Sequence, residues 1–135
     1  MKKKFLLALS LVAILTALLS LSVSADSLRE KWNVSRTAND NVTAYLYNDP
    51  DRGVGFYYLV FAGEGEMADF NSSTPWSYYL TSLTKVIVEE GVTHIGNDAL
   101  YYQSSIKSIS LPSTLISIGD RAFYSCPSLE KNRAS

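Results

Sequence analysis

The chain has 135 residues, with 12 basic and 13 acidic side chains and a formal net charge of −1. That length suits one small domain, and the balanced charge gives no sign of the basic patch with which proteins bind nucleic acid or anionic membranes. Cys126 is the single cysteine, which excludes an internal disulfide framework. Packing must therefore stabilise the fold, and Cys126 is expected to be a buried thiol.

Residues 1–25 have the three parts of a signal peptide. Lysines follow Met1, an apolar run extends from Phe5 to Leu21, and a small-residue cleavage site ends at Ala25. We therefore expect a secreted or cell-surface protein with no membrane span after cleavage. The alternative is an uncleaved anchor, because the 17-residue run reaches the lower limit for crossing a bilayer. Cleavage would leave nine basic and 13 acidic residues, a net charge of about −4.

The segment after the signal peptide is divided into a lead-in and a region of strands. Residues 26–40 are polar and have no sustained period, which predicts a linker or an extended lead-in. Residues 41–82 are expected to form an N-terminal β cap region. Within it, Asn41 to Tyr47 alternates apolar and polar side chains, and Phe56 to Ala62 is rich in β-branched and aromatic ones. The turn-forming residues between these two runs predict a β-hairpin.

Residues 83–128 contain one 23-residue pattern twice. Leu83 aligns with Ile106, and the same offset aligns Ile95 with Ile118 and Gly96 with Gly119. Self-similarity at this period, opening on L-x-x-L-x-L, is the signature of leucine-rich repeats, which stack into solenoids. The apolar positions expected inside the first copy are Leu83, Val86, Val88, Val92, Ile95, Ala99 and Leu100.

The register of the two copies carries three further expectations. Ile95 and Ile118 should stack on each other in the core. The recurrence of glycine at 96 and 119 predicts a backbone conformation that a side chain would strain. A third copy begins in residues 129–135 and stops, which leaves an open coil expected to fray or self-associate. That open edge would be lined by Ile109, Leu111, Leu115, Ile118 and Phe123.

Each copy ends on an I-G-x-x-A-[LF]-Y motif, which starts at Ile95 and again at Ile118. The motif resembles the BspA-like leucine-rich repeat family of secreted or surface proteins of mucosal microbes. The segment from Asn41 to Trp76 is similar to the region that often precedes those repeats. The resemblance implies adhesion or surface binding, with no known chemistry.

Together these patterns predict a mostly β protein, in which an N-terminal β-hairpin cap leads into about two coils of a right-handed leucine-rich-repeat solenoid with short helical turns. We expect a non-catalytic adhesion module that binds a protein or glycan on a host or microbial surface. The alternative is a truncated, exported stub of a longer repeat protein with no function of its own. The binding face would consist of outward strand positions, although these are equally well ordinary solvated residues: Thr84, Lys85, Ile87, Glu89, Lys107, Ser108 and Ser110.

No catalytic, cofactor or metal site is indicated. His94 is the single histidine, which excludes multi-histidine metal sites. Cys126 and His94 are the obvious nucleophilic dyad, but they have different offsets within their copies, so stacking should place them on different sides. The turn at residues 48–53 lacks the ligand spacing of a calcium loop. We therefore expect no enzymatic activity and no cofactor.

Overall fold

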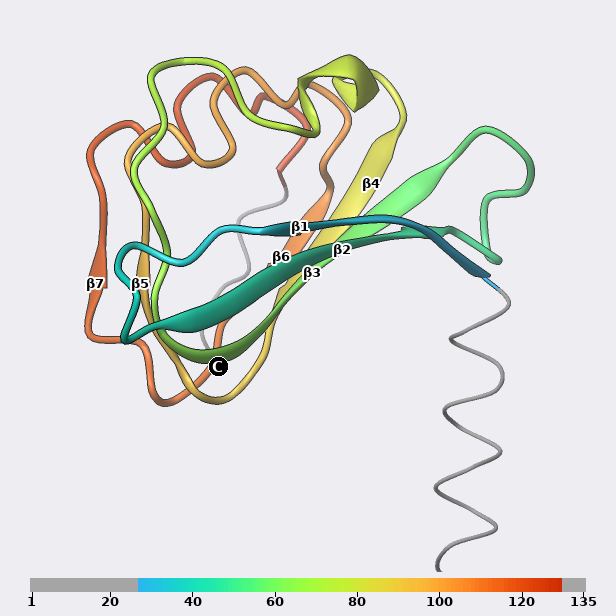
Figure 1. The fold of residues 1–135 in the computed structure, drawn as a ribbon. Helices are drawn as coiled ribbons and strands as arrows, with labels where there is room; N and C mark the ends of the chain where they lie inside the picture. The colour runs from blue at the N-terminus through green and yellow to red at the C-terminus, as the bar shows by residue number, and fades with distance from the viewer. Residues whose placement is uncertain (1–26, 130–135) are drawn as a thin grey trace, which may run out of the picture.

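The computed structural model describes residues 27–129, which form a mostly β molecule (Figure 1). The predicted class is confirmed, since the one helix among these residues is a short 3₁₀ turn, η1. In chain order the elements are β1 (Leu28–Asn33), β2 (Asn41–Asn48), β3 (Tyr57–Glu66), η1 (Ser77–Tyr79), β4 (Leu83–Val88), β5 (Val92–Ile95), β6 (Ser108–Ser110) and β7 (Ser117–Ile118). The predicted signal peptide and residues 130–135 lie outside the described part of the chain.

The first three strands are antiparallel. The predicted hairpin pairing is present, because β2 pairs with β3 in unbroken register from Asn41 opposite Glu64 to Asn48 opposite Tyr57. The lead-in is more ordered than expected, since it contains β1, which pairs with the other edge of β2. The sequence of this segment shows no hydrophobic period because β1 is an edge strand, whose side chains are exposed apart from the half-buried Trp32. Backbone pairing with β2, which leaves no mark on side-chain pattern, holds this strand together with the contact of Trp32 with Trp76.

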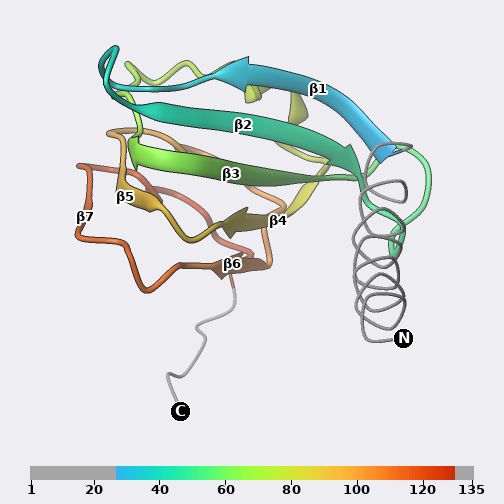
Figure 2. The ribbon, with the colours of Figure 1, turned by 60° about the horizontal axis from the view of Figure 1, so that its bottom comes forward.

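The later strands form two parallel ladders (Figure 2). Strand β3 is long enough to begin both, because its first half pairs with β4 and its last residues pair with β5. Strand β6 then pairs with β4, and β7 with β5, with Val86 opposite Ile109 and Ile95 opposite Ile118. Each of these pairs joins residues 23 apart, so the predicted alignment of the two copies is confirmed.

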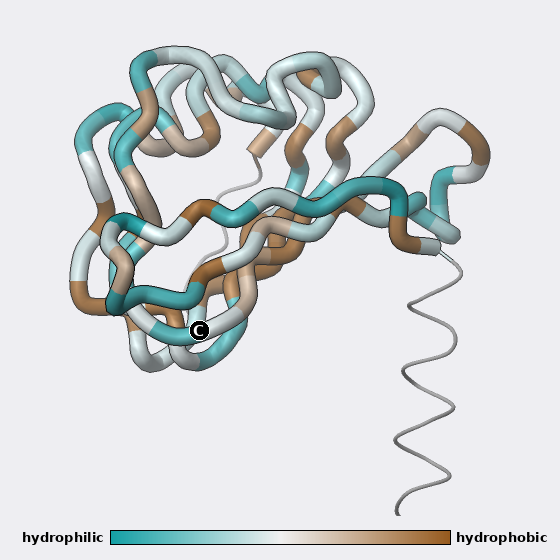
Figure 3. The backbone as a smooth tube through the Cα atoms, viewed as in Figure 1, coloured by the Kyte–Doolittle hydropathy of each residue, from teal (hydrophilic) through white to brown (hydrophobic). Residues whose placement is uncertain are grey.

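The core lies between the two ladders, and hydrophobic residues gather where β2, β3 and β4 lie together (Figure 3). All seven positions predicted to face inward in the first copy are buried, with at most 3% of their surface exposed. Trp76 is fully buried and donates its indole N–H to the Ala99 carbonyl at 2.9 Å. Phe61 and Phe70 pack edge-on against the Trp76 ring. This aromatic cluster anchors the segment before the repeats to the first repeat.

The predicted burial of Ile118 in the core is wrong. Ile118 pairs with Ile95 as expected, yet it is 44% exposed, whereas Ile95 is 1% exposed. The register was right and the predicted burial was wrong, because β7 has no further strand beyond it within residues 27–129. Ile118 therefore covers Ile95 without being covered itself.

The turns after each Ile-Gly pair differ from the short helices predicted. Asp98 and Tyr102 have positive φ values of 58° and 57°, and their counterparts Arg121 and Ser125 have 55° and 56°. A left-handed residue ends right-handed helical winding, so these segments are hydrogen-bonded turns. The same four-residue spacing in both copies makes this conformation a property of the repeat.

Gly96 and Gly119 recur for a reason other than the one predicted. Neither has a positive φ. A Cβ on Gly96 would collide with the carbonyl of Ala68, and a Cβ on Gly119 would collide with Asn97. Close approach of the preceding layer of chain, rather than backbone strain, therefore requires glycine at this position.

Candidate functional site

One face of the main sheet points away from the core, and we call it the outer sheet face. Residues paired across a sheet project to the same side, so the pairing defines this face as two rows across β2, β3, β4 and β6. One row contains Tyr47, Tyr58, Lys85 and Ser108, and the other contains Tyr45, Val60, Ile87 and Ser110.

Tyrosine rings and a lysine stack along this face. The rings of Tyr47 and Tyr58 lie 5.1 Å apart at 17°, and Tyr45 continues the stack at 6.3 Å from Tyr47. Lys85 Nζ lies 4.9 Å from the centre of the Tyr58 ring, on the side of β4. Burial, followed by the neighbouring Tyr58, raises the pKa of Tyr47. Because Tyr58 is covered from both sides, the stack offers ring edges and hydroxyl groups to a ligand rather than a flat platform.

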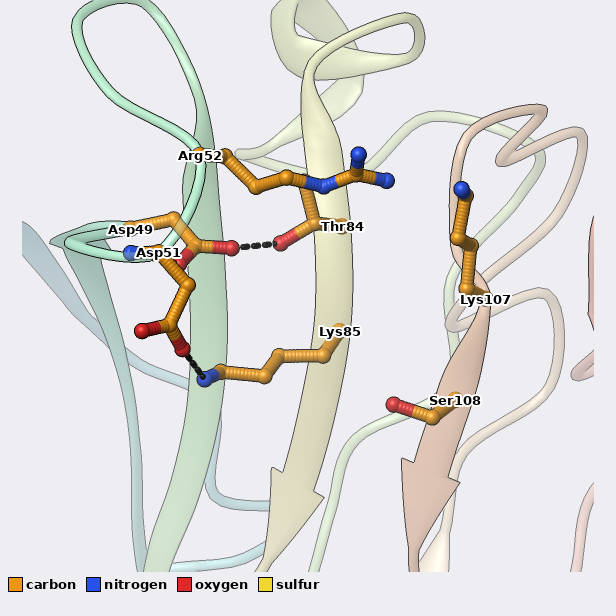
Figure 4. A pocket seen from close by; sticks show the side chains of 7 residues that line it. All are labelled: Asp49, Asp51, Arg52, Thr84, Lys85, Lys107 and Ser108. Atoms are coloured by element: carbon orange, nitrogen blue, oxygen red, sulfur yellow. Dashed lines mark hydrogen bonds and ion pairs between the residues drawn. The ribbon is translucent and has the colours of Figure 1, made fainter.

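A polar hollow of about 190 Å³ opens beside the stack, between the β2–β3 turn and the starts of β4 and β6 (Figure 4). The turn is built around Asp49, which is 3% exposed and whose carbonyl accepts the N–H groups of Arg52 and Gly53. The Asp49 carboxylate accepts the hydroxyl of Thr84 and, at 3.0 Å, the N–H of Asp51. The hollow is lined by Asp49, Asp51, Arg52, Thr84, Lys85, Lys107 and Ser108.

The hollow carries three cations and two carboxylates. Lys85 Nζ lies 3.7 Å from Asp51, whose side chain is 80% exposed. Arg52 and Lys107 are exposed, and neither side chain forms an ion pair with another residue in the range 27–129. In Figure 4 the Arg52 side chain extends across Thr84 toward the side of the hollow where Lys107 stands. Two cationic groups are therefore free to meet an anionic ligand.

The predicted binding positions are mostly brought together here. Lys85, Ile87, Ser108 and Ser110 lie on the outer sheet face, with Lys107 on the wall of the hollow and Glu89 exposed beyond the end of β4. Thr84 is the exception, because it is 6% exposed and holds the β2–β3 turn instead of facing outward. That these residues bind a ligand stays a prediction.

Sequence reasoning missed the part of the face that precedes the repeats. Tyr45 and Tyr47 alternate with the buried residues of β2, so the outward side of that alternation was the available signal. The contribution of Asp51 and Arg52 had no such signal. Their position depends on the contact between Asp49 and Thr84, which are 35 residues apart in the sequence.

A second polar cluster lies on the β5–β7 ladder. His94 Nδ1 is 2.7 Å from the Ser117 hydroxyl, and His94 Nε2 is 3.8 Å from Asp69 Oδ1. A hydrolytic triad needs a hydrogen bond on both sides of its histidine, and the second distance is too long for one. Asp69 instead accepts the N–H of Asn97 and pairs with Arg36, and the Asn97 N–H is the main cause that lowers its pKa.

Cys126, which was expected to be buried, is only partly buried, and it shares no hydrogen bond with His94 in residues 27–129. Its thiol contacts the Leu100 carbonyl at 3.1 Å, and burial raises its pKa. A raised pKa disfavours the thiolate that acts as a nucleophile. Within residues 27–129, no group of three or more acidic, cysteine or histidine side chains is placed to hold a metal ion, and no helix is long and apolar enough to cross a membrane.

Two parallel strand ladders at a 23-residue spacing define a leucine-rich repeat protein. Residues 72–134 match the family described as BspA type Leucine rich repeat region (6 copies). The chain thus carries a BspA-type leucine-rich repeat region, and the resemblance drawn from the I-G-x-x-A motif is confirmed.

The chain is also similar to the solved structure of a leucine-rich repeat protein from Eubacterium ventriosum ATCC 27560. The two share 28% sequence identity with a TM-score of 0.58, over 71% of this chain and 23% of that protein. This chain therefore spans about a quarter of the length of the protein it matches. A search of curated proteins finds no match.

Proposed function

We propose that the chain is an exported, non-catalytic binding module that holds a protein or glycan partner on a host or microbial surface. The observation that carries the proposal is the outer sheet face, where half-buried tyrosines, Ile87 and the polar hollow adjoin each other. A face that combines aromatic and apolar side chains with unpaired charges has the composition of a recognition surface. Membership of a repeat family that generally serves binding supports the same function.

The proposed architecture is a cap followed by coils. Residues 41–82 form the N-terminal β cap, residues 83–128 form two coils of a right-handed solenoid, and residues 129–135 begin a third. The parallel pairing at a 23-residue offset supports the coils. The way in which β3 starts both ladders supports the cap, because it gives the first coil a partner of matching shape.

Export to the medium or the cell surface is part of the proposal. It is supported by the signal-peptide pattern of residues 1–25, which lie outside the described residues. Residues 26–40 connect this signal to the cap. The alternative is an exported structural stub of a longer repeat protein, with no function of its own.

A matched pair of serine variants tests the proposal. Ser110 lies on the outer sheet face and Ser117 on the other ladder, both in the second repeat and both exposed. The purified full-length chain is assayed against a glycan array, mucins and matrix proteins. We expect S110W to weaken binding about tenfold or more and S117W to leave it unchanged.

Two outcomes would contradict the proposed function. Equal weakening by S110W and S117W would exclude the outer sheet face as the binding surface. Absence of binding to every member of the panel would favour the structural stub.

A further inference from the structure

The polar hollow combines groups that fit one kind of ligand. Arg52 and Lys107 supply cationic donors without an ion-pair partner in the range 27–129, and Ser108 supplies a hydroxyl. These groups would bind a carboxylate by charge-assisted hydrogen bonds. We propose that the hollow binds the carboxylate-bearing ring of an acidic sugar, and this inference rests on the binding function proposed above.

The carboxylate of Asp51 decides between a sugar acid and a simple anion. It is 80% exposed at the edge of the hollow and is paired only loosely with Lys85, at 3.7 Å. The negative charge of Asp51 would repel a sulfate or phosphate ion. A sugar acid carries hydroxyl donors beside its carboxylate, and Asp51 can accept from a hydroxyl while the cations meet the carboxylate.

The size of the hollow favours a single ring over a longer chain. Its volume of about 190 Å³ is below the roughly 300–1,000 Å³ of pockets that enclose drug-sized ligands. An acidic peptide would need a length of free sheet edge to bind as an added strand. Strand β6 offers only Ser108–Ser110, so a peptide would gain few main-chain hydrogen bonds.

Recognition in this site is polar rather than aromatic. The nearest ring, Tyr58, is covered by Tyr47 on one side and by Lys85 on the other. A sugar ring therefore cannot stack on Tyr58. The tyrosine fixes Lys85 beside Asp51, which keeps that lysine aligned along the wall of the hollow.

Binding of the full-length chain to matched sugars tests the inference. The probes are oligosaccharides that end in glucuronic acid or sialic acid, the same chain ending in glucose, a polyglutamate peptide and inorganic sulfate. We expect the acidic sugars to bind best. R52Q and K107Q should each weaken that binding about ten- to hundredfold, and K31Q, at an exposed lysine of β1, should not change it.

R52Q and K107Q each replace an exposed side chain that forms no ion pair in the described part of the chain. The melting temperature of both variants should therefore equal that of wild type, which shows that any loss of binding does not come from misfolding. Equal binding of the glucose-terminated and acidic oligosaccharides would overturn the inference. So would stronger binding of polyglutamate or sulfate than of acidic sugars, or no binding of any acidic sugar. If none binds while a mucin or matrix protein still binds and is lost in S110W, this inference fails and the proposed function stands.

Discussion

Ile95 and Ile118 show how position in the stack sets the contribution of a single side chain. They are the same residue at the same place in two repeats, with 1% and 44% of their surface exposed. I95A should lower the free energy of unfolding by about 2–5 kcal/mol, because it leaves a cavity in a packed core. I118A should lower it by about 1 kcal/mol, because part of the side chain is already in water.

Urea unfolding of the two variants measures this difference directly. Equal losses would mean that Ile118 is covered in solution, and the open-edge description of β7 would then be wrong.

Gly96 tests whether the layers of chain approach each other as closely as the structure indicates. G96A places a Cβ against the Ala68 carbonyl, which belongs to the segment before the first repeat. We expect a loss of about 1–3 kcal/mol, since either the backbone or the packing must shift. Thermal melting checks the loss, and an unchanged melting temperature would show that the two layers are further apart.

At the scale of elements, three carboxylates join one layer of chain to the next. Asp40 accepts the N–H of Glu66, Asp69 that of Asn97, and Glu90 that of Ser113, at 2.8 to 2.9 Å. These backbone hydrogen bonds are the main cause that lowers the pKa of each carboxyl group. A depressed folded-state pKa stabilises the fold above the pKa of the unfolded chain, and the benefit is lost as pH falls through the folded value.

The melting temperature should therefore be nearly constant from neutral pH down to about pH 5 and should fall below about pH 4. D69N should lower stability at neutral pH and make the decline in acid shallower. Melting curves of both proteins between pH 7 and pH 3 provide the measurement. Parallel curves for D69N and wild type would show that Asp69 does not link the layers.

The fold could be predicted where side-chain pattern and burial agree. Val86 and Ile95 recur with the repeat and are buried, so their alignment at a 23-residue offset matches the pairing of Val86 with Ile109 and of Ile95 with Ile118. Strand β1 could not be predicted, because its side chains are exposed on an edge. The turns with left-handed residues, which stand where helical turns were expected, could not be predicted either, because no apolar pattern marks those residues.

The candidate site could be predicted in its repeat half and not in the other half. Lys85 and Ser108 follow from the alternation of the strands, whereas Thr84 was misplaced because its hydroxyl binds Asp49. That contact joins a turn to a strand far away in sequence. Nothing local predicts which charged residues of the turn it brings to the face.

For the whole molecule, the two edges of the main sheet differ. Strand β1 carries Arg29, Glu30 and Lys31 and a register shift, which are features that discourage pairing with another chain. Strands β6 and β7 are unpaired on their outer side within residues 27–129, and exposed apolar residues surround them. Leu111 is 46% exposed and Ile116 is 83% exposed.

We expect the full-length chain to self-associate or to fray at the β6–β7 edge. Sedimentation should show a concentration-dependent increase in mass that I116K reduces, because a charge at an edge opposes pairing. Hydrogen exchange should be fast in residues 106–128 relative to β2 and β3. A monomer at all concentrations, with strong protection in residues 106–128, would contradict this expectation.

Oxidative footprinting of tyrosine side chains tests most directly whether the outer sheet face binds the partner. Tyr47 and Tyr58 lie on that face, whereas Tyr102 and Tyr124 are 49% and 53% exposed elsewhere. With the best ligand from the binding panel present, oxidation of Tyr47 and Tyr58 should slow while oxidation of Tyr102 and Tyr124 stays the same. Protection of Tyr102 and Tyr124 with none at Tyr47 and Tyr58 would place the binding surface away from the outer sheet face and contradict this expectation.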